Sequence, residues 1–222
     1  LDAKAAKTAR RQWALKSDAE KRLLRDVLPR FDRAVDQMER LLSPTRSEHG
    51  IYSSLEDVAE NPYILTEQYV GDDPDDYISF HKIDHGVLPS PELGGEPLFG
   101  KDDWQRLRAL CVERLKGESR HCFAAADKIM GDVNRRILHL PEWKKHTFST
   151  RYLEVDEEDL SVALEFRQLD EKRYVYLKSV YEDERMIEHV VRQLAGRPDI
   201  SFRTPITDKH WKSYLTNTDS VL

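Results

Sequence analysis

The sequence is poor in the features that mark disulfide-stabilised, membrane-spanning and secreted proteins. Its 222 residues include only two cysteines, Cys111 and Cys122, too few and too scattered for a disulfide framework or a cysteine-rich metal site. No stretch approaches the ~18 apolar residues that a membrane helix needs. The first segment, LDAKAAKTARR, lacks the apolar core of a signal peptide. These absences predict a cytoplasmic protein without a membrane partner.

A complete catalytic motif is also missing. Residues 95–101 (GEPLFGK) fit the spacing G-x-x-x-x-G-K of a phosphate-binding loop. That loop needs a following Ser or Thr to ligate magnesium and a buried strand before it. Asp102 follows instead, and no apolar strand precedes Gly95. No serine lies in a nucleophile-elbow pattern either. We therefore expect no catalytic residue, metal or cofactor in the chain, which would act by binding.

Three weaker signals have plainer explanations. His81 and His85 have a spacing that suits two metal ligands on a helix, but no third ligand is evident. The acidic run at 72–76 lacks the terminal Glu of a calcium-binding loop, which indicates a solvated loop. Cys122, beside His121, suits a small core position better than catalysis.

The net charge of −6 is distributed unevenly along the chain. It is +4 over residues 1–50, −10 over 51–100, +4 over 101–150 and −4 over 151–222. This alternation argues against a chain that binds phosphates along its whole length. Any contact with nucleic acid is therefore expected from local patches.

The first long element is a helix predicted at residues 17–42. It begins with a capping box of Ser17 and Glu20, and its apolar residues recur every three or four positions. Pro29 should kink or split it. The apolar stripe requires a packing partner.

A short helix follows at residues 53–60, with a second capping box of Ser53 and Glu56. Residues 71–100 are rich in glycine and proline, which predicts a loop. The main domain boundary is placed there.

The second half predicts a different unit. Its expected elements are a helix at 102–116, a strand at 120–124, a helix at 125–138, an irregular stretch at 139–155, a helix at 156–169, a strand at 173–181 and a helix at 182–194. Helix, strand, helix, helix and strand is the order of a winged-helix domain. The alternation of aromatic and β-branched residues supports the second strand.

A cluster of basic residues in this unit gives the candidate site. Arg135 and Arg136 end the second helix, Lys144 and Lys145 follow it, and Arg173 flanks the third helix. In a winged-helix unit such positions lie near the face that meets DNA. The alternative is that these cations contact solvent or a neighbouring domain, or stabilise helix C-termini.

Several motifs occur in an order that resembles a known family. Residues 55–65 (LEDVAENPYIL) match the signature L-x-x-x-x-x-NPY-x-L, and residues 79–84 (SFHKID) are similar to its gF-x-x-aD turn, without the glycines expected before Phe80. The helix at 104–116 and the segment RHCF at 120–123 resemble an Arg- and Leu-rich helix followed by GH-x-(F/Y). Over roughly 55–195 the chain thus resembles the non-motor region of RecD-type helicases, the family of the exodeoxyribonuclease V alpha subunit.

The elements and the resemblance together predict a mainly α protein. Residues 1–100 would form a helical arm and a degenerate helix-hairpin-helix segment, and residues 101–198 a winged-helix-like unit with a small β component. Residues 199–222 would be a linker toward a motor domain. The opening on Leu1 without a methionine hints at a fragment of a longer protein.

The resemblance implies a non-catalytic accessory region that positions DNA, or docks a partner subunit, for unwinding in repair and recombination. ATP and Mg²⁺ would belong to the motor of the parent protein. One alternative is a protein–protein scaffold without DNA contact, which uses the apolar face of 17–42 or the acidic segment 51–100. Another is a standalone winged-helix regulator, which the overall acidity disfavours.

Overall fold

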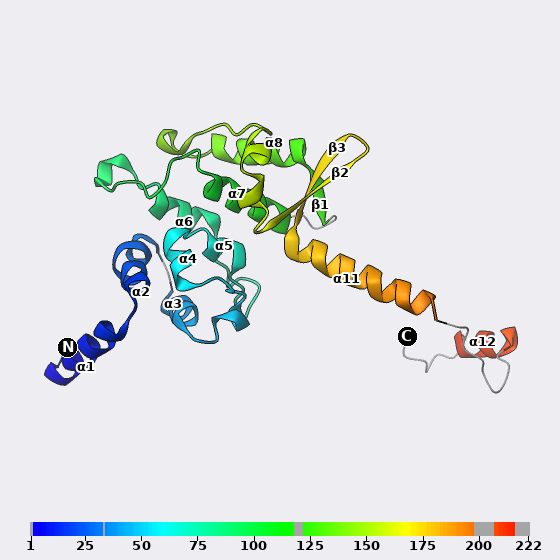
Figure 1. Cartoon of the computed structure of the whole chain (residues 1–222), viewed down its shortest axis with the longest axis horizontal. Coiled ribbons are helices and arrows are strands. Elements are labelled where there is room, and N and C mark those ends of the chain that lie inside the picture. Colours follow the sequence, from blue (N-terminus) through cyan, green and yellow to red (C-terminus); the bar gives the residue numbers. More distant parts are fainter. Residues whose placement is uncertain (1, 33, 118–121, 198–206, 216–222) are drawn as a thin grey trace. The chain divides into compact units, whose positions relative to one another are not determined.

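The computed structural model describes residues 2–32, 34–117, 122–197 and 207–215. In these ranges the protein is mainly helical, with one small antiparallel sheet of three strands (Figure 1). The chain divides into two compact units, Leu1–Glu182 and Asp183–Leu222. The first unit includes all of the first predicted region, 1–100, and residues 101–182 of the second, 101–198. The predicted linker at 199–222 lies largely outside the described residues, which include only α12 (Asp208–Leu215) there.

The first helix, α1 (Ala3–Leu15), has no buried residue. The side chain of Asp2 caps it by accepting a hydrogen bond from the backbone nitrogen of Ala5 at 2.6 Å. Alanine supplies most of its helix propensity. Because it has no apolar stripe, periodicity did not reveal it.

The helix predicted at 17–42 is split, as Pro29 suggested. It comprises α2 (Asp18–Arg22), a π-helical turn (Leu23–Val27), a 3-10 turn (Leu28–Arg30) and α3 (Val35–Leu42). The capping box of Ser17 and Glu20 is confirmed. The apolar stripe lies in the protein's own core, through the buried residues Leu23, Val27, Leu28, Phe31 and Leu41. The buried part of this face is therefore not available to a separate protein partner.

The next three helices are α4 (Leu55–Glu60), α5 (Ile64–Gln68) and α6 (Phe80–Val87). The capping box of α4 uses Ser54 and Asp57, one residue later than predicted.

The loop predicted at 71–100 is interrupted by α6, whose glycine has a packing role. A Cβ atom on Gly86 would lie 2.5 Å from the backbone oxygen of Arg30 and equally close to the ring of Phe31. Gly86 thus permits close packing rather than ending the helix.

The remaining elements of the sheet-containing region follow in order. They are α7 (Trp104–Lys116), β1 (Phe123–Ala125), α8 (Ala126–Leu138), α9 (Tyr152–Val155), α10 (Glu157–Leu160), β2 (Leu164–Leu169), β3 (Lys172–Leu177) and α11 (Lys178–Ala195). The strand order is β1-β3-β2, and both pairings are antiparallel.

The helix predicted at 156–169 is wrong beyond Leu160, because β2 pairs with β3 through a tight turn. Asp170 and Glu171 form that turn with φ of 46° and 64°. The strand predicted at 173–181 ends at Leu177, where α11 begins. Residues 120 and 121 of the first predicted strand lie outside the described residues.

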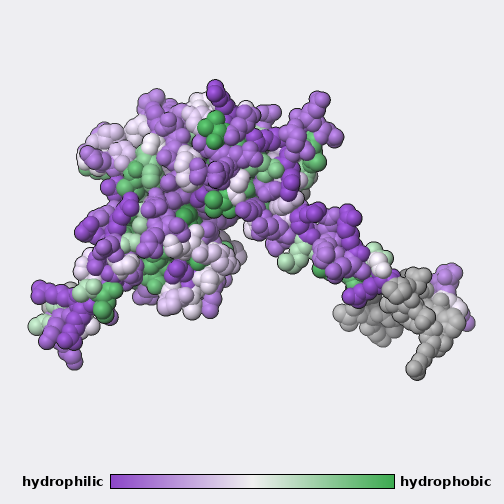
Figure 2. Space-filling model, viewed as in Figure 1, coloured by the Kyte–Doolittle hydropathy of each residue, from purple (hydrophilic) through white to green (hydrophobic). Residues whose placement is uncertain are grey.

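The core is organised around α7. This helix contacts α5, α6, α8, α10 and β3 and is buried along most of its length. On the sheet, Val175 is fully buried and pairs with Ala124 on one side and Phe166 on the other. The face of the molecule in Figure 2 is largely hydrophilic, with apolar residues in small patches.

Candidate nucleic-acid interface

Arg135 and Arg136, two of the five predicted contacts, lie in the last turn of α8. Arg135 Nη1 lies 2.9 Å from Asp132 Oδ1, and Arg136 forms an ion pair with Glu113 on α7. The Arg136 guanidinium also lies 5.4 Å from the centre of the Phe80 ring. Their side chains keep 72% and 45% of their exposure, so both remain accessible to a ligand.

These two arginines line a groove of about 390 Å³ between α7 and α8, here called the α7–α8 groove. Its lining consists of Leu110, Arg114, Asp132, Val133, Arg135, Arg136 and His139. Arg114 Nε lies 2.7 Å from Asp132 Oδ2, so one carboxylate serves two guanidinium groups. With three arginines against Asp132 in its lining and Glu113 beside Arg136, the groove keeps a small excess of positive charge, which favours an anionic ligand.

Lys144, the third predicted contact, does not belong to a surface site. Its side chain is 1% exposed, and its Nζ lies 2.9 Å from the backbone oxygen of Asp84 and 3.1 Å from Asp84 Oδ2. Burial lowers the pKa of Lys144, and Asp84 opposes that shift. A phosphate cannot reach this ammonium group, so Lys144 is removed from the candidate site.

The last two predicted contacts do not line the groove. Lys145 Nζ lies 3.0 Å from Glu142 in the preceding turn. Arg173 Nη2 lies 2.7 Å from Glu157 Oε2, and its guanidinium stacks 4.6 Å from the centre of the Phe166 ring. Arg173 thus connects β3 to α10 and has a local structural role.

The region around α9 and α10 is acidic. Five carboxylates and no cation lie in residues 154–159, here called the acidic segment, and all but the partly buried Asp156 are exposed. Burial and the neighbouring Asp159 raise the pKa of Asp156. Asp170 and Glu171 add two carboxylates in the turn between β2 and β3. These surfaces repel a phosphate backbone.

A buried polar cluster joins three of the segments on which the family resemblance rests, residues 55–65, 79–84 and 104–116. Tyr63 of the NPY motif donates a hydrogen bond from its hydroxyl to Asp84 Oδ1 at 2.8 Å, and its ring stacks on Phe80 at 5.5 Å. Arg106 Nε lies 2.8 Å from Asp84 Oδ1, and Lys144 completes the cluster. Burial alone would raise the pKa of Asp84, but the two cations hold it below its ordinary value.

A second buried ion pair lies between α5 and α7. Arg108 Nε lies 3.0 Å from Glu67 Oε1, and Arg108 Nη1 donates to the backbone oxygen of Asp159 at 3.0 Å. Burial raises the pKa of Glu67, although Arg108 opposes the shift. Nothing in the local sequence marks these cations as internal, because each of them also suits an exposed helix face.

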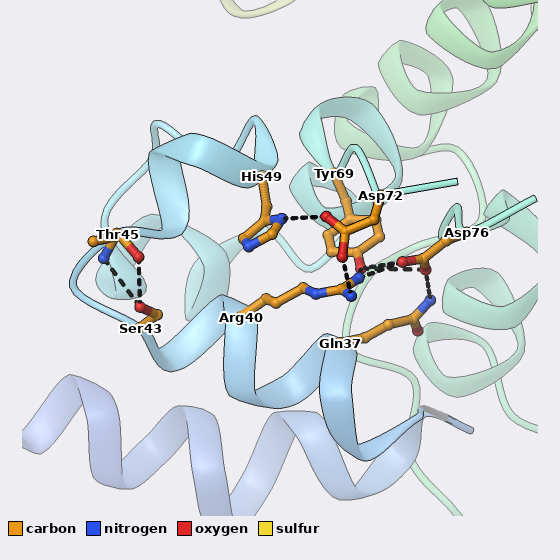
Figure 3. A network of polar contacts seen from close by, with 8 residues as sticks. All are labelled: Gln37, Arg40, Ser43, Thr45, His49, Tyr69, Asp72 and Asp76. Carbon is orange, nitrogen blue, oxygen red and sulfur yellow. Dashed lines mark hydrogen bonds and ion pairs between the residues drawn. The ribbon is translucent and has the colours of Figure 1, made fainter. Parts of the chain in front are cut away.

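The acidic loop at 72–76 is held by α3 (Figure 3). Arg40 forms ion pairs with Asp76 and with Asp72, the latter at 2.7 Å, and donates to the Tyr69 hydroxyl at 2.7 Å. Gln37 Nε2 donates to Asp76 at 2.9 Å. Hydrogen bonds from Gln37 and Arg40 hold the pKa of Asp76 low. The loop is therefore a fixed part of the fold rather than a cation-binding loop.

The remaining motifs do not form sites. His81 and His85 are exposed on α6 with ring centres 6.3 Å apart, but Asp84 between them points into the core. No group of three potential metal ligands occurs within the described ranges.

The near-match at 95–101 does not fit ATP and magnesium. A 3-10 turn (Pro91–Leu93) precedes it where a buried strand is required, and Asp102 still follows. Asp103 caps α7 by accepting a hydrogen bond from the backbone of Gln105 at 2.8 Å.

The two thiols have opposite surroundings. Cys111 is buried, and burial raises its pKa to about 12. Cys122 is exposed, so the predicted core role for Cys122 is wrong.

The comparisons with known proteins give no match: no family model, curated protein or solved structure matches the chain. None of the helices in the described ranges combines the length and the apolar character needed to cross a bilayer.

Proposed function

We propose that the chain is a non-catalytic accessory region of a RecD-type DNA helicase, located in the cytoplasm. It helps to position DNA, or to dock a partner subunit, while a motor domain of the same parent protein uses ATP and Mg²⁺. The proposal is supported by a contact between two of the resembling segments. Tyr63 and Asp84, which lie in separate motifs, form one buried cluster.

The main support for the winged-helix part of the proposal is the topology of residues 104–177. The helix α7, the strand β1, the helices α8 and α10, and the hairpin β2–β3 follow each other in the order of a winged-helix unit. The sheet order β1-β3-β2 places β3 in the middle, so the hairpin turn at Asp170 takes the place of the wing. A helix-hairpin-helix segment would correspond to α4, α5 and α6.

In this proposal DNA meets the α7–α8 groove rather than the winged-helix recognition face. A DNA-reading winged helix uses the helix at the position of α10 together with the wing. Here α10 and the wing carry the acidic segment and the acidic turn. The groove supplies three arginines instead.

The test is a salt-titrated binding assay with forked, duplex and single-stranded DNA. We expect the double variant Arg135→Ala, Arg136→Ala to bind less tightly and to reduce the slope of log Kobs against log salt concentration by about 1–2. The matched control is Arg185→Ala, Arg192→Ala, which removes two arginines that also have an acidic partner on the surface. Equal binding and equal slopes for the two variants contradict a DNA role for the groove.

The acidic segment favours one alternative, a protein–protein scaffold that holds a basic partner surface without DNA contact. That scaffold binds none of the three DNA substrates at physiological salt. The same assay on the wild-type chain therefore separates the two functions. A standalone regulator has less support, because α10 carries no basic residue.

A further inference from the structure

The cations of α1 differ from every cation of the predicted site. Lys4, Lys7, Arg10 and Arg11 are all exposed, and within the described part of the chain none of their side chains forms an ion pair or hydrogen bond. Each of the five residues predicted from the sequence, by contrast, has a carboxylate partner. The helix has no acidic residue after its cap at Asp2. Its positive charge is therefore uncompensated.

The four side chains share one face of the helix. At about 100° per residue, positions 4, 7, 10 and 11 lie within an arc of about 120°. At a rise of 1.5 Å per residue, the face extends for about 10 Å along the axis. Trp13, which is 40% exposed, follows Arg10 by three residues and so borders this face. We call it the cationic face of α1.

We propose that the cationic face of α1 binds the phosphodiester backbone of DNA. Double-stranded DNA carries one negative charge per ~1.7 Å of axis, so a face about 10 Å long spans several phosphates. Lysine and arginine side chains that have no acidic partner replace the counterions without first breaking an ion pair. The choice of DNA among polyanions rests on the function proposed above.

The opposite face of the helix argues against a membrane surface. A helix that lies in a bilayer interface inserts bulky apolar side chains. The residues opposite the cations are mainly small, including Ala5, Ala6 and Ala9. In the whole helix only Trp13 and Leu15 are large and apolar, and both lie at its C-terminal end. Trp13 can instead stack on an unpaired base, so the face also suits the backbone of single-stranded DNA.

The test compares two variants with the same loss of charge. The first is Lys4→Gln, Lys7→Gln, Arg10→Gln, Arg11→Gln. The control is Lys82→Gln, Lys101→Gln, Arg151→Gln, Lys172→Gln, which removes four exposed cations that also lack a partner among the described residues. Binding of fluorescent duplex and single-stranded DNA is measured between about 50 and 200 mM salt. We expect the α1 variant to make the log–log salt slope shallower by about 2–4, and the control by less than 1.

The outcomes separate this proposal from the function on which it rests. If the α1 variant and the control change the slope equally, the cationic face is not a DNA site, whereas the α7–α8 groove can still be one. If the wild-type chain binds no DNA, both proposals are overturned. Tighter binding to phosphatidylserine vesicles or to poly-glutamate than to DNA overturns the choice of ligand. The charge-preserving variant Lys4→Arg, Lys7→Arg, Arg10→Lys, Arg11→Lys should keep the wild-type slope.

Discussion

Residues 1–50 and residues 101–150 both carry a net charge of +4, but the cations of α1 in the first region and three cations of the second are in opposite environments. In the second region Arg106, Arg108 and Lys144 are buried against carboxylates. In the first region the cations of α1 are exposed and have no partner among the described residues. Equal charge in two stretches of sequence therefore does not mean equal capacity to bind an anion. The capacity of a cation to bind an external anion depends on whether the fold already places a carboxylate beside it.

The sharpest test of the buried group is Arg106→Ala. It removes the main partner of Asp84 and leaves a buried carboxylate with Lys144 and Tyr63 only. Loss of one partner of a buried ion pair costs about 3–5 kcal/mol. Urea unfolding monitored by circular dichroism measures the free energy of unfolding. Lys145→Ala, at an exposed pair, is the control, with an expected change of about 0.5 kcal/mol or less. Similar losses for both variants contradict the distinction between the two groups.

Lys144→Met should separate stability from DNA binding. The variant keeps the aliphatic stem and removes the ammonium group that Asp84 accepts bonds from. We expect the free energy of unfolding to fall by about 1–3 kcal/mol. The DNA affinity and its salt slope should not change, because the side chain is 1% exposed. A reduced salt slope would contradict this prediction and would show that Lys144 contributes to DNA binding.

The buried cluster also predicts how stability depends on pH. The pKa of Asp84 is lower in the folded protein than its ordinary value, so its contribution is present above that ordinary value. This contribution is lost as the pH falls through the folded pKa. Asp84→Asn should therefore flatten the decrease in stability below about pH 4. Thermal unfolding of the wild-type chain and of Asp84→Asn across this pH range checks the prediction. An equal decrease in stability with falling pH for the two proteins would refute it.

The smallest effect on the free energy of unfolding is expected from substitutions in α1. The variant Lys4→Gln, Lys7→Gln, Arg10→Gln, Arg11→Gln should change the free energy of unfolding by no more than about 0.5 kcal/mol, because none of these side chains is buried. Urea unfolding of this variant and of Arg106→Ala compares the contributions of the exposed and the buried cations to the free energy of unfolding. A loss of more than about 1 kcal/mol indicates that α1 packs on the rest of the unit.

Local signals predicted the elements that local contacts determine. The capping box at Ser17, the split at Pro29 and the helices α7 and α8 all follow from short-range patterns. The capping box of α4 was one residue out, since Ser53 and Ser54 both precede an acidic residue three positions on.

The predictions of secondary structure that were wrong lie where residues distant in the sequence determine the local structure. Residues 164–169 were predicted as the end of a longer helix, and their pairing with β3 makes them a strand. Gly86 lies in the stretch predicted as a loop, and its role in close packing is visible only beside Arg30 and Phe31.

The candidate site was predictable only in part. Arg135 and Arg136 were placed correctly at the end of α8, but their groove requires Arg114 from α7. Lys144 carries the same sequence signal as Lys145, and only the tertiary structure separates the buried residue from the exposed one. For α1, the signal was four cations within eight residues and no carboxylate among them.

The unequal thiols have a practical consequence for these experiments. Cys111 is shielded and has a pKa of about 12, so it stays protonated near neutral pH, whereas Cys122 is exposed next to β1. A maleimide dye should therefore attach at one position in the folded wild-type chain without any prior removal of cysteines. A fluorophore at Cys122 would then report, by energy transfer to labelled DNA, how far the bound strand lies from the sheet.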